Sequence, residues 1–376
     1  MVTLFLAGDV MTGRGIDQIL PHPSEPEIFE DDIKFAPAYI MLAEHANGPM
    51  PCRVPFDYVW GDALHELERR RPDARIVNLE TAVTSSGKPE PKGINYHMNP
   101  ANGSVLAAAK LDCCVIANNH ILDWGERGLL DTLRVLESTG ILTAGAGLNL
   151  REASEPAIIN VSPSVRVLVF GLGAECSGIP PFWEAGTHTP GIRLLPDFSD
   201  ETAQGLASQI LPQKRPGDIV VLSVHWGSNW GYSIPAAHEA FARALIDEGA
   251  CDILHGHSSH HARPMEVYKG KLILYGCGDF INDYEGISGH EDYRGDLAPM
   301  YLAEIDEEDG ILQKLTIVLF QMHRFRLRYA SETDVLWFQK RMNDCSQDFG
   351  VRLRCNGDAS LSVAGTWHDQ SMRRQQ

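Results

Sequence analysis

Short apolar runs that end in polar residues recur along this chain. The five clearest are 5–9, 76–80, 115–120, 219–225 and 253–257, which end in Asp9, Glu80, Asn119-His120, His225 and His257. An apolar run of about four to eight residues bounded by Gly, Asn or Asp is typical of a buried strand. Ligands of open α/β sheets bind at the carboxyl ends of the strands. The polar residues that end these runs are therefore predicted to share one site.

Helical patterns alternate with the strand-like runs. Apolar residues recur with helical spacing over 61–70, 125–139 and 236–248, and the last two segments stop at Gly140 and Gly249, as helix ends do. Further strands are predicted near 141–144, 157–161, 165–171, 219–224, 252–255 and 271–275. Residues 297–305 and 312–320 flank an acidic turn and predict a hairpin. This alternation indicates mixed sheets covered by helices.

The domain organisation is predicted from changes in composition. Residues 1–323 are expected to form one domain, with Pro-rich loop insertions at about 21–55 and 177–200 near the mouth of the site. Residues 324–376 turn basic and amphipathic, and they predict a C-terminal extension with a helix over 334–343 and a frayed tail from about 366.

Charge and composition exclude several classes of function. The formal net charge of −18 argues against nucleic-acid binding and against docking on an anionic membrane. No uninterrupted apolar segment reaches the roughly 18–20 residues of a membrane span, and the first residues are predicted to form a strand, not a signal peptide. The eight cysteines contain no CxxC pair, which favours a reducing compartment. The predicted location is the cytoplasm.

The residues at the strand ends are typical ligands of divalent transition metals. Asp9 and Glu80 are carboxylates that would be costly to bury without a cation, and the alternative is that they pair with Arg14 or with backbone N–H groups. Imidazole comes from His225 and from a dense cluster in which His257 and His260 are the first candidates and His255 and His261 the alternatives. This mixture of oxygen and nitrogen suits one or two ions of Mn, Fe or Zn.

Asn119-His120 is the sharpest single element. The Asn119 oxygen can bind a metal without adding charge, and His120 can act as a general acid toward a leaving group. Asp123 is placed to hold the His120 ring in one tautomer. The alternative is a polar cap on the following helix. Arg14, close behind Asp9, is predicted to clamp an anionic group of the substrate through its bidentate fork.

Five motifs resemble, in the same order, those of the CapA family of poly-γ-glutamate capsule biosynthesis proteins, a branch of the calcineurin-like metallophosphoesterases. They are Gly8–Arg14, Asn78–Thr81, Ala117–Gly125, Val224–Gly227 and Gly256–His260, and 275–280 fits as well. The resemblance implies a four-layer α/β/β/α sandwich with a dinuclear metal site. It also implies the metal ligands Asp9, Glu80, Asn119, His225, His257 and His260. In that scheme Glu80 bridges the two metals and His120 protonates the leaving oxygen.

Three positions depart from the usual phosphoesterase pattern. Met11 stands where a histidine is usual, Glu80 replaces an aspartate, and the Gly256–His260 motif is one residue longer. Residues 278–283 are predicted either to line the site or to cap a turn.

The resemblance implies a metal-dependent hydrolase of the phosphoesterase class that acts on a phosphorylated or poly-acidic substrate in poly-γ-glutamate or related polymer biosynthesis. One alternative is an accessory or binding subunit of a polymer-synthesising ligase complex. A further alternative is an amide or peptide hydrolase that uses the same metals, because a metal-activated water attacks a carbonyl carbon as well as phosphorus.

Overall fold

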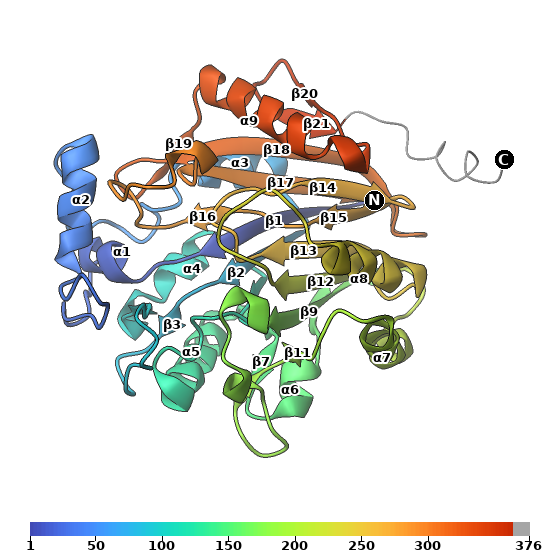
Figure 1. The fold of residues 1–376 in the computed structure, drawn as a ribbon, viewed down its shortest axis with the longest axis horizontal. Helices are drawn as coiled ribbons and strands as arrows, with labels where there is room; N and C mark the ends of the chain where they lie inside the picture. The colour runs from blue at the N-terminus through green and yellow to red at the C-terminus, as the bar shows by residue number, and fades with distance from the viewer. Residues whose placement is uncertain (364–376) are drawn as a thin grey trace.

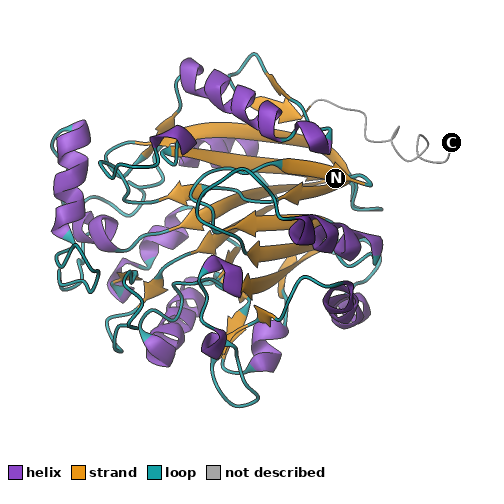
Figure 2. Cartoon of the chain, viewed as in Figure 1, coloured by secondary structure: helices purple, strands orange, loops and turns teal. Residues whose placement is uncertain are grey.

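Two facing β-sheets form the centre of the structure, a computed structural model that describes residues 1–363 (Figures 1 and 2). The larger sheet contains β1 (Val2–Val10), β2 (Ala74–Leu79), β5 (Cys113–Val115), β6 (Leu142–Ala144), β16 (Asp279–Ile281), β17 (Leu297–Ile305), β18 (Leu312–Met322), β19 (Leu327–Tyr329), β20 (Leu353–Cys355) and β21 (Leu361–Val363). Its order is β20-β21-β18-β17-β1-β2-β5-β6, while β16 pairs with β1 and β19 with β18.

The smaller sheet has the order β11-β9-β12-β13-β15-β14, with β8 paired to β9. Its strands are β8 (Ala157–Asn160), β9 (Arg166–Ala174), β11 (Leu194–Leu195), β12 (Ile219–His225), β13 (Ile253–His257), β14 (Met265–Tyr268) and β15 (Lys271–Leu274). Two short pairs, β3 (Ala82–Val83) with β4 (His97–Met98) and β7 (Ala146–Gly147) with β10 (Gly191–Ile192), complete the strands.

The apolar core has three layers, because alternate side chains along each strand enter the layer on one face of the sheet or the layer on the other. On β1, Leu4 and Leu6 enter the core between the sheets, while Phe5 enters the core on the opposite face. On β12, Val221 faces the same inter-sheet core and Leu222 faces outward to helices. Successive strand residues point to opposite faces, so each sheet is covered on both sides. The predicted four-layer α/β/β/α architecture is confirmed.

Helices cover the outer faces of both sheets. Those packed on the larger sheet include α3 (Asp62–Arg70), α4 (Ser104–Ala108) and α5 (Gly125–Thr139), and those on the smaller sheet are α7 (Asp200–Ile210) and α8 (Ala236–Asp247). The remaining α-helices are α1 (Arg14–Ile19), α2 (Pro37–Asn47), α6 (Leu150–Ser154) and α9 (Glu332–Cys345). The helices predicted from 61, 125 and 236 and the hairpin of β17 and β18 are confirmed.

The prediction of irregular loops over 21–55 and 177–200 is wrong in part. Residues 37–47 form α2, which begins with Pro37 at its first position. Proline is favoured there because its fixed φ suits a helix start, and the Ala, Met and Leu residues that follow are good helix formers. The second segment contains the short strands β10 and β11. These segments are rich in proline and acidic residues, which are typical of loops. The sequence therefore did not reveal the short helix and strands, which neighbouring parts of the fold stabilise.

Residues 324–363 add secondary structure to the larger sheet. β19 and β21 pair with β18, and α9 confirms the helix predicted at 334–343. A domain boundary at 324 stays a prediction, and the predicted tail from 366 lies outside the described residues. Within residues 1–363, none of the helices has both the length and the apolar character needed to cross a membrane.

The topology brings the carboxyl ends of strands from both sheets together. β1, β2 and β5 run parallel in the larger sheet, and β12 and β13 run parallel in the smaller one, with His225 opposite His257. β16 also runs parallel to β1 and places Asp279 opposite Asp9. Gly8 permits this approach because a side chain there would collide with the backbone carbonyl of Gly278.

We expect Gly8→Ala to destabilise the protein by about 3 kcal/mol, because the added methyl overpacks a backbone contact that cannot relax. Gly205→Ala is the matched control, since Gly205 lies in α7 with open space around its Cα. There alanine should stabilise the helix by about 0.5–1 kcal/mol. Urea unfolding measures both. Equal unfolding midpoints for the two variants would contradict the tight contact of β1 with β16.

Candidate metal centre

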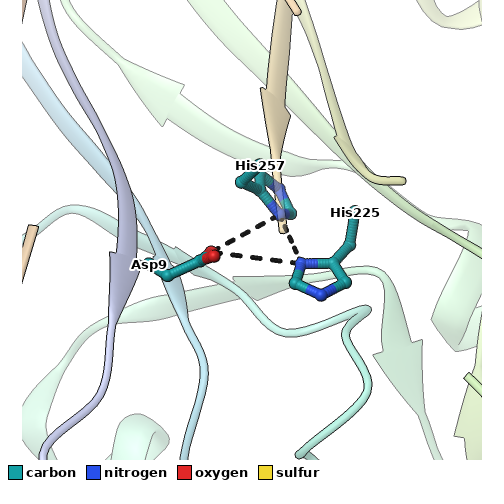
Figure 3. A group of neighbouring side chains, drawn as sticks. All are labelled: Asp9, His225 and His257. Carbon is teal, nitrogen blue, oxygen red and sulfur yellow. Dashed lines mark hydrogen bonds and ion pairs between the residues drawn. The ribbon is translucent and has the colours of Figure 1, made fainter. Parts of the chain in front are cut away.

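Three buried side chains from three strands converge between the sheets (Figure 3). The Nδ1 atoms of His225 and His257 are 2.8 Å apart, and Asp9 Oδ1 lies 4.0 Å from the first and 3.8 Å from the second. Donor atoms around a tetrahedral zinc ion are about 3.3 Å apart, given metal–ligand bonds of about 2.0–2.1 Å. The three observed separations lie on either side of that value. The donors therefore fit one divalent metal after small side-chain movements.

A chain of hydrogen bonds determines the tautomer of His257. His255 Nε2 donates to the Ala7 carbonyl at 2.9 Å, so His255 Nδ1 accepts from the Ser223 hydroxyl at 2.9 Å. The Ser223 oxygen is then left to accept from His257 Nε2, also at 2.9 Å. His257 Nδ1 therefore carries a lone pair directed at Asp9 and His225. An outer hydrogen bond of this kind orients metal-binding histidines in general.

Asn119 acts on His225 in the same way. Its Oδ1 lies 3.0 Å from His225 Nε2, which makes Nε2 the donor and leaves the lone pair on Nδ1. Two imidazole lone pairs then face each other across 2.8 Å. This arrangement is repulsive without a cation between them. Asn119 thus lies at the centre as predicted, and its role as a direct ligand stays a prediction.

Burial gives these groups the protonation states of a metal-free site. Burial and the neighbouring Asp279 raise the pKa of Asp9 to about 7 from an ordinary value of 3.8. Burial and Asp9 raise the pKa of Glu80 well above its usual range, and burial and adjacent imidazoles lower the pKa of His257. The raised pKa values favour protonated carboxyls, whose protons a bound cation would displace, and the lowered pKa of His257 favours the neutral imidazole that a metal ligand must be.

His120 points its free nitrogen toward the carboxylates. His120 Nδ1 bonds to Asp123 Oδ2 at 2.6 Å, which is the contact predicted for these two residues, and His120 Nε2 lies 3.9 Å from Glu80 Oε1. The ring stacks on Tyr96 with a centroid separation of 3.8 Å. Lys92 Nζ lies 2.7 Å from Asp123 Oδ1 and balances its charge. The ring is therefore held in one orientation, whereas its catalytic role stays a prediction.

The alternative that this segment caps a helix is not supported. α5 begins at Gly125 with Trp124 as its N-cap residue, and no side chain accepts a capping hydrogen bond there. The side chains of Asn119 and Asp123 instead bond to His225 and His120.

Arg14 lies in a buried network of its own. Its guanidinium bonds to both carboxylate oxygens of Asp283, to Glu30 Oε1 at 2.9 Å and to the Tyr39 hydroxyl at 2.7 Å. Burial opposes the charged form, but Asp283 raises the pKa of Arg14 further above its usual range. The carboxylates of Asp9 and Glu80 are not among its partners. These contacts favour a structural role over the predicted substrate clamp.

The remaining histidines of the cluster divide into different environments. His260 Nδ1 lies 3.1 Å from Asp279 Oδ1, so His260 contacts a carboxylate and not the imidazole pair. His261 is satisfied by Ala262 O and by the Gly231 N–H, and His255 belongs to the hydrogen-bond chain above. Met11 Sδ accepts from the Gly13 N–H at 3.2 Å and is directed into its own turn.

Several residues of the centre were not assigned from the sequence. Asn78 donates to Asp9 Oδ1 at 2.6 Å, and a polar residue inside an apolar strand could have signalled it. Ser258 donates its N–H to Asp9 Oδ2 at 3.1 Å from a backbone with φ of 100°. Such a conformation costs about 1–3 kcal/mol in a non-glycine residue and is characteristic of functional sites. Lys92 and Tyr96 come from a segment without any periodic pattern, so only the fold reveals them.

Comparison with known proteins identifies the chain's relatives. The family described as Bacterial capsule synthesis protein PGA_cap matches residues 3–284. A probable polyglutamine synthesis accessory protein of Mycobacterium tuberculosis (strain H37Rv) is 45% identical over 365 residues, which cover 96% of both chains. Capsule biosynthesis protein CapA of Bacillus anthracis is 27% identical over 75% of this chain and 60% of its own. PGA biosynthesis protein CapA of Bacillus subtilis is 28% identical over 73% and 62%.

We expect Ser223→Ala to weaken metal binding by about 10–100-fold, because it breaks the hydrogen-bond chain that orients His257. Isothermal titration of the metal-free protein with Zn²⁺ measures the change. Ser346→Ala is the control, since Ser346 is also buried and accepts one hydrogen bond, from Met265 N. Unchanged affinity in Ser223→Ala would show that the hydrogen-bond chain does not orient the ligand.

Proposed function

The chain belongs to the PGA_cap family of bacterial capsule synthesis proteins, and we propose that it is an accessory component in the synthesis of a glutamate- or glutamine-based polymer. The observation that carries this proposal is the 45% identity, over 96% of both chains, to a relative whose name describes a polyglutamine synthesis accessory protein. Similarity over 96% of the chain extends into the C-terminal segment that follows the family match. The partner in this proposal is the enzyme complex that builds the polymer.

The charge of the protein limits how an accessory role can work. At a net charge of −18, the field of the whole protein repels a polyanion such as a poly-acidic chain. An anionic substrate is therefore best accommodated where a cation offsets the local negative charge. Two overlapping groups in the described structure have suitable ligands for one: Asp9 with His225 and His257, and Asp9 with Glu80 and Asp279.

A second candidate function is hydrolysis of a phosphoester, and one specific observation favours it. His120 has one nitrogen held by Asp123 and the other directed toward Glu80. This orientation suits a general acid toward a leaving oxygen, and because burial and the nearby Lys92 lower the pKa of His120, the ring would have to gain its proton when an anionic substrate binds. A divalent metal bound at the centre would supply Lewis acidity and a more acidic water. Asp123 and Tyr96 hold the His120 ring, and Lys92 partly offsets the burial that raises the pKa of the Asp123 carboxyl to about 7.

The accessory role is tested in cells that make the polymer and lack this chain. Polymer yield should fall without the chain and return when either the wild type or His120→Ala is restored, because an accessory component does not need the general acid. Glu80→Ala should fail to restore it, since losing this carboxylate removes metal and stability together. Unchanged yield in the absence of the chain would refute the accessory role, and recovery with the wild type alone would favour catalysis.

The hydrolytic function is tested with purified protein. His120→Ala should keep its metal yet slow hydrolysis of alkyl phosphates by about 10²–10⁴-fold, the usual contribution of general acid catalysis. A p-nitrophenyl ester should be affected far less, because its leaving group needs no proton. His45→Ala is the control, as His45 is exposed on α2. Equal slowing of both esters would remove His120 from the protonation step.

A further inference from the structure

Arg263 is a buried arginine without a carboxylate partner. It lies between β13 and β14 and is 4% exposed, and among residues 1–363 it forms no ion pair. Its Nη2 donates only to neutral oxygens, which are the Ser228 carbonyl at 2.6 Å, the Ser228 hydroxyl at 2.9 Å and the Trp230 carbonyl at 3.4 Å. Its Nε is buried and has no acceptor among the described residues. The guanidinium therefore has donors to spare.

Arg14 shows how this chain neutralises a buried guanidinium elsewhere. It bonds to both oxygens of Asp283 and to Glu30. A guanidinium keeps its charge in proteins, and a buried charge without a counter-ion is costly. The chain has 50 acidic residues, so the lack of a carboxylate beside Arg263 leaves a position that an external anion can fill.

The side chains around Arg263 do not supply the missing negative charge. Burial lowers the pKa of Arg263, and the nearby Cys176 and Tyr293 offset only part of that effect. Burial and then Arg263 itself lower the pKa of His238 to about 4, so that ring is neutral at neutral pH. A bound anion would stabilise the guanidinium where these neighbours do not.

Arg263 borders a part of the surface that a ligand can reach. A side chain at Gly227 would place its Cβ 3.2 Å from Arg263 Nη1, and the Gly227 N–H donates to Cys176 Sγ at 3.2 Å. Cys176 and Ser228 are both exposed. An anion can therefore approach the guanidinium from the side of these two residues.

The surroundings of Arg263 are continuous with the metal centre. Gly227 follows His225 by two residues, so their Cα atoms are at most about 7 Å apart. Ser258 connects the two places, because its hydroxyl donates to the Gly227 carbonyl at 3.3 Å and its N–H donates to Asp9 Oδ2 at 3.1 Å. A ligand held by Arg263 thus lies beside the loop that follows His225.

We propose that Arg263 binds a carboxylate of a glutamate-based polymer next to the metal centre. The inference rests on the proposed function, which supplies the polymer. Guanidinium N–H groups and carboxylate oxygens form strong, charge-assisted hydrogen bonds. A chain with repeated carboxylates can occupy Arg263 and the metal centre together, and each contact then raises the effective concentration for the other. Arg263 takes the role that the sequence predicted for Arg14.

The test is calorimetric titration of the full-length chain, with and without Zn²⁺, using a short oligomer of γ-linked glutamate. Arg263→Gln should weaken binding by about 10–100-fold, because it removes charge-assisted hydrogen bonds. Arg263→Lys should weaken it less, since lysine keeps the charge and loses the planar fork. Arg352→Gln is the matched control, because Arg352 is exposed and its loss changes the net charge equally.

Thermal unfolding verifies the fold of each variant, and Arg263→Lys carries the test if Arg263→Gln does not fold. An oligomer that does not bind the wild type, or that binds both folded variants equally well, would overturn the inference and leave Arg263 as a support of the 227–231 loop. Displacement of the oligomer by a lower concentration of inorganic phosphate would overturn the assignment to a carboxylate. Binding that depends on Arg263, in a protein that polymer synthesis does not require, would leave the inference intact and refute the accessory role.

Discussion

The neutralisation of one buried carboxylate, Asp9, is the constraint on which the rest of the centre depends. Asp9 is fully buried at the carboxyl end of β1, and Glu80 and Asp279 lie beside it. Burial in a low-dielectric interior opposes three negative charges in one place. Protons or cations must therefore occupy the centre. Because the lone pairs of His225 and His257 face each other, a metal cation neutralises the centre better than a proton does. A proton can be shared by only two atoms at a time, whereas a metal ion can bind several donors.

The surrounding fold maintains this concentration of donors at the ends of packed strands. β1 and β2 contribute carboxylates from one sheet, and β12 and β13 contribute imidazoles from the other. The buried Ser223 and His255 orient His257, and the strained backbone of Ser258 directs an N–H at Asp9. A site held by strands and buried hydrogen bonds is more rigid than one held by loops. A rigid centre suits an accessory protein in which the metal stabilises the structure, and it suits a hydrolase equally well.

The sequence-based predictions were most accurate where local pattern and chemistry coincide. Strand ends are recognisable from an apolar run followed by a polar residue, and Asp9, His225 and His257, which this pattern predicted to share one site, do lie close together. Arg14 comes shortly after Asp9 in the sequence and was predicted to reach the same site. Its guanidinium instead bonds to Glu30 and Asp283, and no local sequence pattern predicts those partners. The helix α2 was missed because proline and acidic residues resemble those of a loop.

The amino-acid sequence by itself determined the alternation of strands and helices and the residue types at the strand ends, and its resemblance to a known family implied the four-layer architecture. The alternation follows from side-chain periodicity of 2.0 or 3.6 residues, which is local. Only the tertiary structure decided that Asp279 stands opposite Asp9, that Lys92 balances Asp123, and that His260 contacts a carboxylate. Those contacts join segments far apart in the chain, and their geometry follows from sheet register and packing, which no short stretch of sequence encodes.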